Sequence, residues 1–149
     1  MSLRDIYNPN VITVLESTPV LEAASRMREN HVGDLVVVAR KAGRTVPVGI
    51  VTDRDLAVGV LAKKAPAEHL TAGDIMSLQL VTISESEGVF DAVRKMKRSG
   101  VRRLPVVNAK GGLVGILTAD DLLDLLGQEL AALAALVRGQ RKREKKIRK

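Results

Sequence analysis

The sequence contains no cysteine and no tryptophan, with one phenylalanine and one tyrosine. Without cysteine the chain can form neither disulfides nor thiolate metal sites, and nothing points to an oxidising compartment. Apolar residues still make up 46% of the chain, so the core must consist of Val, Ile, Leu and Ala. Such a core is typical of buried strands covered by helices. The composition therefore favours a mixed α/β protein, either one ordinary domain or two small packed halves.

A long apolar run is also missing. The longest, residues 122–137, is interrupted by Asp124, Gln128 and Glu129, whereas a bilayer span needs about 20 mostly apolar residues. The first five residues are not followed by the apolar segment of a secretory signal. We therefore expect a cytoplasmic protein that makes no membrane contact.

Most of the chain lacks an excess of either charge. The formal net charge is +7, but residues 138–149 hold eight Lys or Arg and one Glu, and residues 1–137 carry equal numbers of basic and acidic groups. Any electrostatic attraction of a partner therefore belongs to the tail Arg138–Lys149. The tail is either a solvated end or a weak contact for nucleic acid or an acidic protein, and both alternatives remain open.

The chain contains two copies of one pattern. A shift of 69 positions places Met27 on Met96 and Leu35 on Leu104 without a gap. Beyond three extra residues near Ala42 the shift becomes 66, and a Val-Gly-Ile segment again coincides. Ordered identities of this kind indicate an internal duplication. We expect copies at residues 1–64 and 74–127, a linker over 65–73, and a helical extension with the basic tail over 128–149.

Each copy is predicted to fold as β-α-β-β-α, which gives an α/β (α+β) fold. In the first copy we expect strands at 11–14, 35–38 and 46–51, and helices at 19–29 and from residue 53. In the second copy we expect strands at 80–83, 104–107 and 113–117, and helices at 89–98 and from residue 119. One copy alone leaves a sheet face uncovered, so the two should pack sheet to sheet.

One motif recurs where the last strand of each copy meets the following helix. It reads Gly-Ile-Val-Thr-Asp-Arg-Asp in the first copy and Gly-Ile-Leu-Thr-Ala-Asp-Asp in the second. The Thr (Thr52 or Thr118) lies at a helix N-terminus, where unpaired N–H groups favour phosphate. The Asp three residues later (Asp55 or Asp121) lies on the same face and can accept from both ribose hydroxyls. The Ile before the Thr offers an apolar wall to a flat base.

An ordinary helix cap explains a single Thr-x-x-Asp as well as a ligand does. Its recurrence in register favours a nucleotide site. With both motifs and the paired strands Leu35–Val38 and Leu104–Val107, residues 5–126 resemble a tandem pair of cystathionine β-synthase (CBS) domains, or Bateman module. The resemblance implies a non-catalytic regulatory sensor of an adenine ligand. AMP, ADP or ATP is expected first, with NAD or S-adenosylmethionine as alternatives and no obligatory cofactor.

The resemblance also implies two clefts, each built from both repeats. One cleft would hold phosphate and ribose on the second motif, place basic groups near the phosphate, and pack the base on the first repeat: Thr118, Asp121, Ile116, Arg102, Arg103, Ile12, Val32 and Tyr7. The other would combine the first motif with apolar residues of the second repeat: Thr52, Asp55, Ile50, Val81 and Val101. The first copy has Gly33 and Asp34 at the positions of Arg102 and Arg103, so we expect stronger binding beside Asp121.

No dinucleotide fingerprint, P-loop or zinc-protease motif occurs, so we expect no catalytic residues and no metal site. The last helix should continue from Ala119 with an apolar stripe at spacings of three and four, made by Leu122, Leu126, Leu130, Leu133 and Val137. We expect a homodimer in which helices from all four repeats form the contacts and this face reinforces them, with packing of the face on its own sheet as the alternative. A scaffold with vestigial clefts is a further alternative function.

Overall fold

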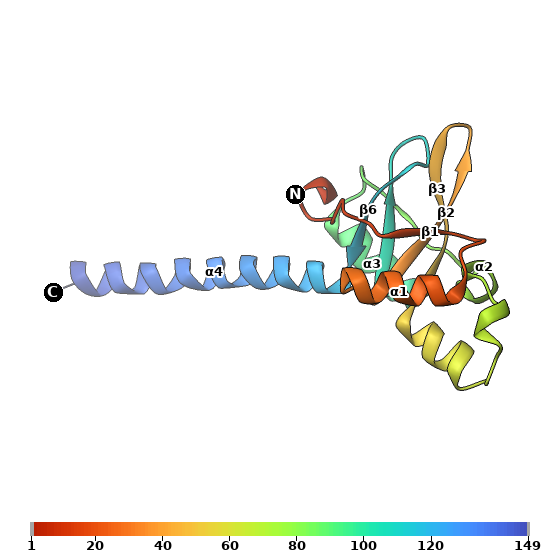
Figure 1. The fold of residues 1–149 in the computed structure, drawn as a ribbon. Coiled ribbons are helices and arrows are strands. Elements are labelled where there is room, and N and C mark those ends of the chain that lie inside the picture. Colours follow the sequence, from red (N-terminus) through yellow and green to blue (C-terminus); the bar gives the residue numbers. More distant parts are fainter. Residues whose placement is uncertain (1, 149) are drawn as a thin grey trace.

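The computed structural model describes residues 2–148 and contains two small sheets with one long helix projecting from the body (Figure 1). The first sheet comprises β1 (Thr13–Leu15), β2 (Asp34–Lys41) and β3 (Arg44–Thr52). The second comprises β4 (Ile83–Ser84), β5 (Arg103–Val107) and β6 (Leu113–Thr118). In both sheets the first pair of strands is parallel and the second pair antiparallel. The predicted α+β fold with two equivalent halves is confirmed.

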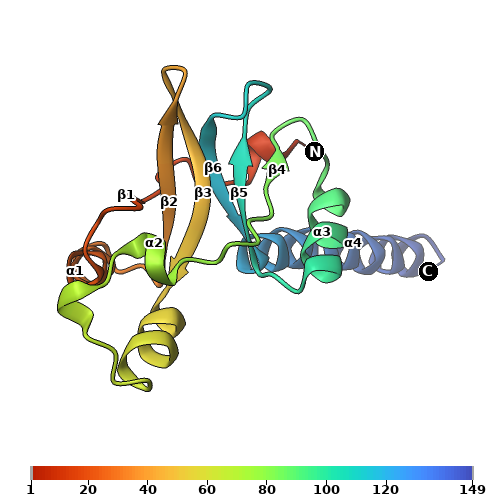
Figure 2. The same cartoon turned by 90° about the vertical axis from the view of Figure 1, so that its right-hand side faces the viewer.

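The helices lie on the outer faces of the paired sheets (Figure 2). On the side of the first sheet are α1 (Val20–Asn30), the π-helix η2 (Asp55–Leu61), the 3-10 helix η3 (Ala67–His69) and α2 (Ala72–Ile75). On the side of the second sheet are the 3-10 helix η1 (Leu3–Asp5), α3 (Val89–Ser99) and α4 (Ala119–Ile147). Within residues 2–148, no helix is both long and apolar enough to cross a membrane.

Three elements differ from the sequence prediction: β1, β4 and η2. The first strand of each copy is shorter than expected and begins later, at Thr13 and Ile83. The helix that follows Thr52 begins as predicted, but it continues as a π-helix in which Ala62 N–H donates to Ala57 O at 2.9 Å. Its valines and glycine are weak α-helix formers, so the local sequence does little to favour the tighter helix.

The two sheets meet through a small apolar interface. Val36 and Val38 of β2 pack with Ile116 of β6, all at most 7% exposed. At one edge of this interface, Arg103 Nε lies 2.6 Å from Asp34 Oδ2. These two residues coincide under the 69-residue shift, so the ion pair joins equivalent positions across the pseudo-two-fold axis. It links the first residue of β2 to the first residue of β5.

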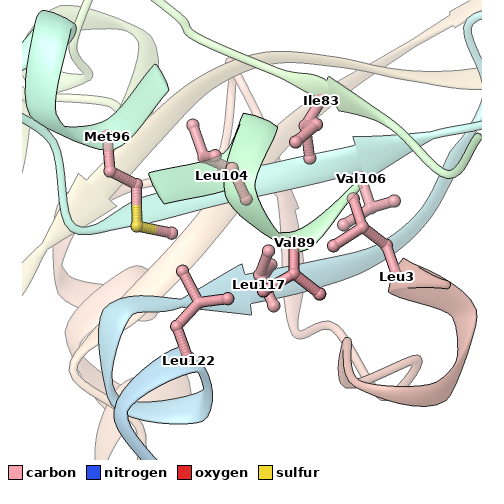
Figure 3. Packing of buried hydrophobic residues seen from close by; sticks show 9 residues of the cluster. Leu3, Ile83, Val89, Met96, Leu104, Val106, Leu117 and Leu122 are labelled. Carbon is pink, nitrogen blue, oxygen red and sulfur yellow. The ribbon is translucent and has the colours of Figure 1, made fainter. Parts of the chain in front are cut away.

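Each half of the core is completed by a segment from the other half. Leu3 of η1 is fully buried among second-sheet residues, including Val106 and Leu117 (Figure 3). Conversely, Ala72 of α2 is fully buried in the cluster of the first sheet. The segment predicted as a linker over residues 65–73 therefore contains a residue of the first core.

Candidate functional site

Both Thr-x-x-Asp motifs form reciprocal helix caps. Thr52 N–H donates to Asp55 Oδ2 at 2.8 Å, and Asp55 N–H donates to Thr52 Oγ1 at 3.1 Å. The corresponding bonds between Thr118 and Asp121 measure 2.8 and 3.2 Å. The helix cap that the sequence analysis considered as an alternative to a ligand site is therefore present in both copies. In both motifs the Asp caps through Oδ2, and Oδ1 accepts no hydrogen bond from residues 2–148.

A cleft of about 200 Å³ lies beside the first motif, between the two repeats. It is lined by side chains from both halves: Ile50, Thr52, Asp55, Ser77, Gln79, Leu80, Val81, Val101, Arg102 and Arg103. The structure thus brings together all five residues predicted for this cleft. Their chemistry combines an apolar wall, one carboxylate, the N-terminus of a helix and two guanidinium groups.

The arginine pair is the main departure from the predicted site. The sequence assigned Arg102 and Arg103 to the Asp121 cleft alone, but in the structure both also line the Thr52 cleft. They also line a neighbouring hollow of about 250 Å³ together with Asp34, Thr118 and Asp120. Arg103 is held by Asp34, whereas the Arg102 side chain is 74% exposed and meets Asp120 at 3.5 Å. Arg102 can therefore turn toward an anion in either space.

The residues predicted for the second cleft do not gather in the same way. The wall residue Ile116 is 7% exposed and is packed by Val11, whereas its counterpart Ile50 lines the open cleft. Ile12 and Val32 pack against the core of the first sheet. Asp121 lines a separate hollow that it shares with Asp5, Ile6, Asp124, Leu125 and Gln128. The residues predicted around Asp55 therefore share one cleft with both arginines, whereas those predicted around Asp121 are dispersed over separate places.

Tyr7 has a packing role that the sequence did not indicate. It lies over Gly115 of β6, where an added Cβ would overlap its ring. Met76, its counterpart under the 69-residue shift, covers Gly49 of β3 in the same manner. Each side chain thus seals the strand that leads into a Thr-x-x-Asp motif.

Sequence reasoning missed three lining residues, Ser77, Gln79 and Leu80. They belong to an extended segment that Ser77 N–H fixes to Ile50 O at 3.0 Å. The 69-residue shift aligns them with Asn8, Asn10 and Val11, which are different residues. The repeat comparison therefore carried no signal for them. Across the described chain, no group of three or more His, Asp or Glu is placed to hold a metal ion.

The sequence matches the CBS domain family over residues 3–61 and 72–128. The chain belongs to this family, as a tandem CBS pair. The uncharacterized protein MK0525 of Methanopyrus kandleri is 36% identical to it over 125 residues. That match covers 84% of this chain and 62% of the relative, so the chain spans less than two thirds of that protein.

Two solved structures share the fold and hold adenosyl ligands. The CBS domain pair of protein MJ0100, in complex with 5′-methylthioadenosine and S-adenosyl-L-methionine, has a TM-score of 0.74 and 29% identity. It matches 87% of this chain and 98% of its own. The CBS domain protein PAE2072 from Pyrobaculum aerophilum, complexed with AMP, has a TM-score of 0.72 and 27% identity. It matches 81% of this chain and 89% of its own.

Proposed function

We propose that this chain is a non-catalytic regulatory sensor that binds AMP in the cleft beside Thr52 and Asp55. The observation that carries the proposal is the composition of this cleft. It combines the start of a helix, a carboxylate with one available oxygen, an apolar wall and an arginine pair. The two solved relatives with bound adenosyl compounds support the same ligand class.

Each part of the nucleotide has a matching group. Asp55 Oδ1 accepts from the ribose hydroxyls, since Oδ2 is used by Thr52 N–H. The base lies against the apolar wall of Ile50, Val81 and Val101. The phosphate lies at the helix N-terminus within reach of Arg102, where a charge-assisted hydrogen bond is stronger than a neutral one.

The charge and size of the cleft favour AMP over the other adenine compounds. S-adenosylmethionine carries a sulfonium cation, which the arginine pair disfavours. NAD is larger by a second nucleoside, whereas the cleft residues supply one carboxylate and one apolar wall, which suits a single nucleoside. ADP and ATP place more negative charge near Arg102, but Asp34 already neutralises Arg103. We therefore rank AMP first and ADP or ATP second.

Calorimetric titration with AMP, ATP, NAD and S-adenosylmethionine tests the assignment. Asp55→Ala should weaken AMP binding by about 1.5–3 kcal/mol, because it removes charge-assisted bonds to the ribose. Asp121→Ala is the matched control, since it removes the same kind of helix cap from the other repeat and should change affinity less. Unchanged binding in Asp55→Ala would contradict the site. No binding of any adenine compound to the native chain would favour a scaffold with vestigial clefts.

A contact between residues 138–149 and nucleic acid or an acidic protein stays a prediction from the sequence alone.

A further inference from the structure

The helix α4 carries an apolar stripe that its own chain leaves uncovered. Leu122, predicted to lead this stripe, is 4% exposed and belongs to the second core. The uncovered stripe begins one residue later, and we call it the leucine seam: Leu123, Leu126, Leu130, Leu133 and Val137. Four of its side chains are 45–67% exposed, and Leu126 is partly exposed. From residue 127 to 148 every residue is exposed, as α4 extends away from both sheets (Figure 1).

The spacing of the seam is that of a coiled coil. Its members are separated by three, four, three and four residues, which matches the a and d positions of successive heptads. The 29 residues of α4 span about 43 Å at about 1.5 Å per residue, long enough for several such turns. An isolated helix gains little from propensity alone, so a helix of this length with an apolar seam needs a partner helix.

Charge along α4 is strongly divided. Residues 119–130 contain four acidic groups and no Lys or Arg, residues 131–137 contain no charge, and residues 138–149 contain eight basic groups and one Glu. Complementing the helix dipole accounts for acids in the first turn, such as Asp120 and Asp121. It does not account for Asp124 and Glu129, which lie beyond that turn. We call residues 119–130 the acidic root of α4; its carboxylates offer a surface to a basic segment.

We propose that the leucine seam binds the α4 of a second copy of this chain in an antiparallel two-stranded coiled coil. In a parallel pair, the two strongly basic ends would lie side by side and repel each other. In an antiparallel pair, each basic end lies along the acidic root of the other helix. The apolar seam supplies the contact, and the charge division selects the orientation.

The seam fixes one register in which both features agree. When Leu130 packs against Leu133 of the partner subunit, Leu126 meets the partner's Val137 and Leu123 meets the partner's Gln140. The same register places Asp120 on the flank near the partner's Arg141. Apolar residues then fill the middle of the coiled coil. At each of its two ends, the acidic root of one helix lies beside the basic end of the other. This contact lies outside the Thr52 cleft, so it stands or falls separately from AMP binding.

Light scattering at micromolar concentration tests the association. The native chain should have a dimeric mass, and the double variant Leu130→Glu with Leu133→Glu should raise the dissociation constant at least about 100-fold, because charges would be buried in the seam. Ala135→Glu is the matched control, since it adds the same side chain on the opposite face of α4 and should remain dimeric. Circular dichroism verifies that helix content is retained. A monomeric native chain, or a seam variant that stays dimeric, overturns the proposal.

Orientation can be read by cross-linking, because the chain has no cysteine to interfere. Leu123→Cys and Gln140→Cys chains, one of them isotope-labelled, are mixed and oxidised, and the products are weighed by mass spectrometry. The antiparallel register predicts a disulfide between the two different chains. Equivalent positions lie about 25 Å apart along the axis, at 1.5 Å per residue, so neither variant should cross-link to itself. Self-cross-linked Gln140→Cys, or no cross-link at all, contradicts the antiparallel coil.

Discussion

At the scale of single residues, the two halves differ in what covers the glycine that lies three residues before each motif threonine, Gly49 or Gly115. A Cβ on Gly115 would overlap the Tyr7 ring and lie 2.9 Å from the backbone oxygen of Asn8. The three atoms nearest to a Cβ on Gly49 all belong to the side chain of Met76, whose thioether can change rotamer. The same added methyl group therefore meets a rigid neighbour in one repeat and an adaptable neighbour in the other.

We predict that Gly115→Ala lowers the free energy of unfolding by about 2–3 kcal/mol, because an overpacked site must displace the backbone or an aromatic ring. Gly49→Ala should cost about 1 kcal/mol or less, because Met76 can move. Urea unfolding of the two variants measures both values. Equal decreases in the free energy of unfolding would show that Tyr7 moves aside as easily as Met76.

The residues of the candidate site show which of its features the local sequence pattern can predict. Three-residue spacing at a strand end sufficed to predict that Thr52 and Asp55 share a helical turn, and the structure confirms their contact. The position of Arg102 depends instead on how two repeats pack across a pseudo-axis. Pattern within one repeat contains no information about that packing, so it could not predict that the arginine pair lines the Thr52 cleft as well.

At the scale of elements, the carboxylate of Glu87 joins the turn before α3 to a lysine of that helix. Glu87 Oε2 accepts from Ser84 N–H at 2.8 Å and from Lys95 Nζ at 2.9 Å. Burial raises the pKa of Glu87, but the hydrogen bonds and charge of Lys95, together with Ser84 N–H, outweigh it and leave the pKa below the ordinary 4.5. A carboxyl with a lowered folded-state pKa stabilises the fold above its unfolded-state pKa. That stability is lost as the pH falls through the folded-state value.

We predict that Glu87→Gln lowers the free energy of unfolding by about 1 kcal/mol at pH 7, since the side chain is partly exposed and solvent screens the pair. The difference from the native chain should shrink as the pH falls below 4.5, where the native carboxyl also becomes protonated. Chemical unfolding at pH 7 and pH 3 measures it. A difference that is the same at both pH values would exclude an ionic origin.

Elements with a strong local signal were predicted well. The continuous apolar run at 35–38 lies in β2, and α1 and α3 begin within one residue of their predicted starts. The π-helix η2 was not predicted, because the spacing of apolar residues over seven positions does not distinguish it from an α-helix. Only the first member of the α4 stripe was predicted wrongly, since the burial of Leu122 depends on the tertiary fold.

At the scale of the whole molecule, the exchange of segments between halves makes the short helix η1 part of the second core. Leu3 is fully buried although it is the third residue of the chain. We predict that Leu3→Ala lowers the free energy of unfolding by about 2–5 kcal/mol, as expected for a core leucine. Arg4→Ala, at an exposed neighbour, should change it by less than about 0.5 kcal/mol.

Guanidinium unfolding followed by circular dichroism measures both variants. Because η1 and α2 each cross to the other half, the native chain and Leu3→Ala should both unfold in a single transition. Two separate transitions would mean that the halves are independent. A Leu3→Ala variant as stable as Arg4→Ala would mean that the N-terminal turn contributes little.

The same exchange governs how the chain folds during its synthesis. The first sheet cannot complete its core until Ala72 leaves the ribosome, whereas Leu3 emerges long before Leu117 and Leu122, against which it packs. The apolar turn therefore stays uncovered on the nascent chain until the second repeat has been made, and such surfaces are prone to misassembly. A chain with a single copy would have to borrow this turn from another molecule. Duplication placed the donor and the acceptor on one polypeptide, so closure of each half no longer depends on protein concentration.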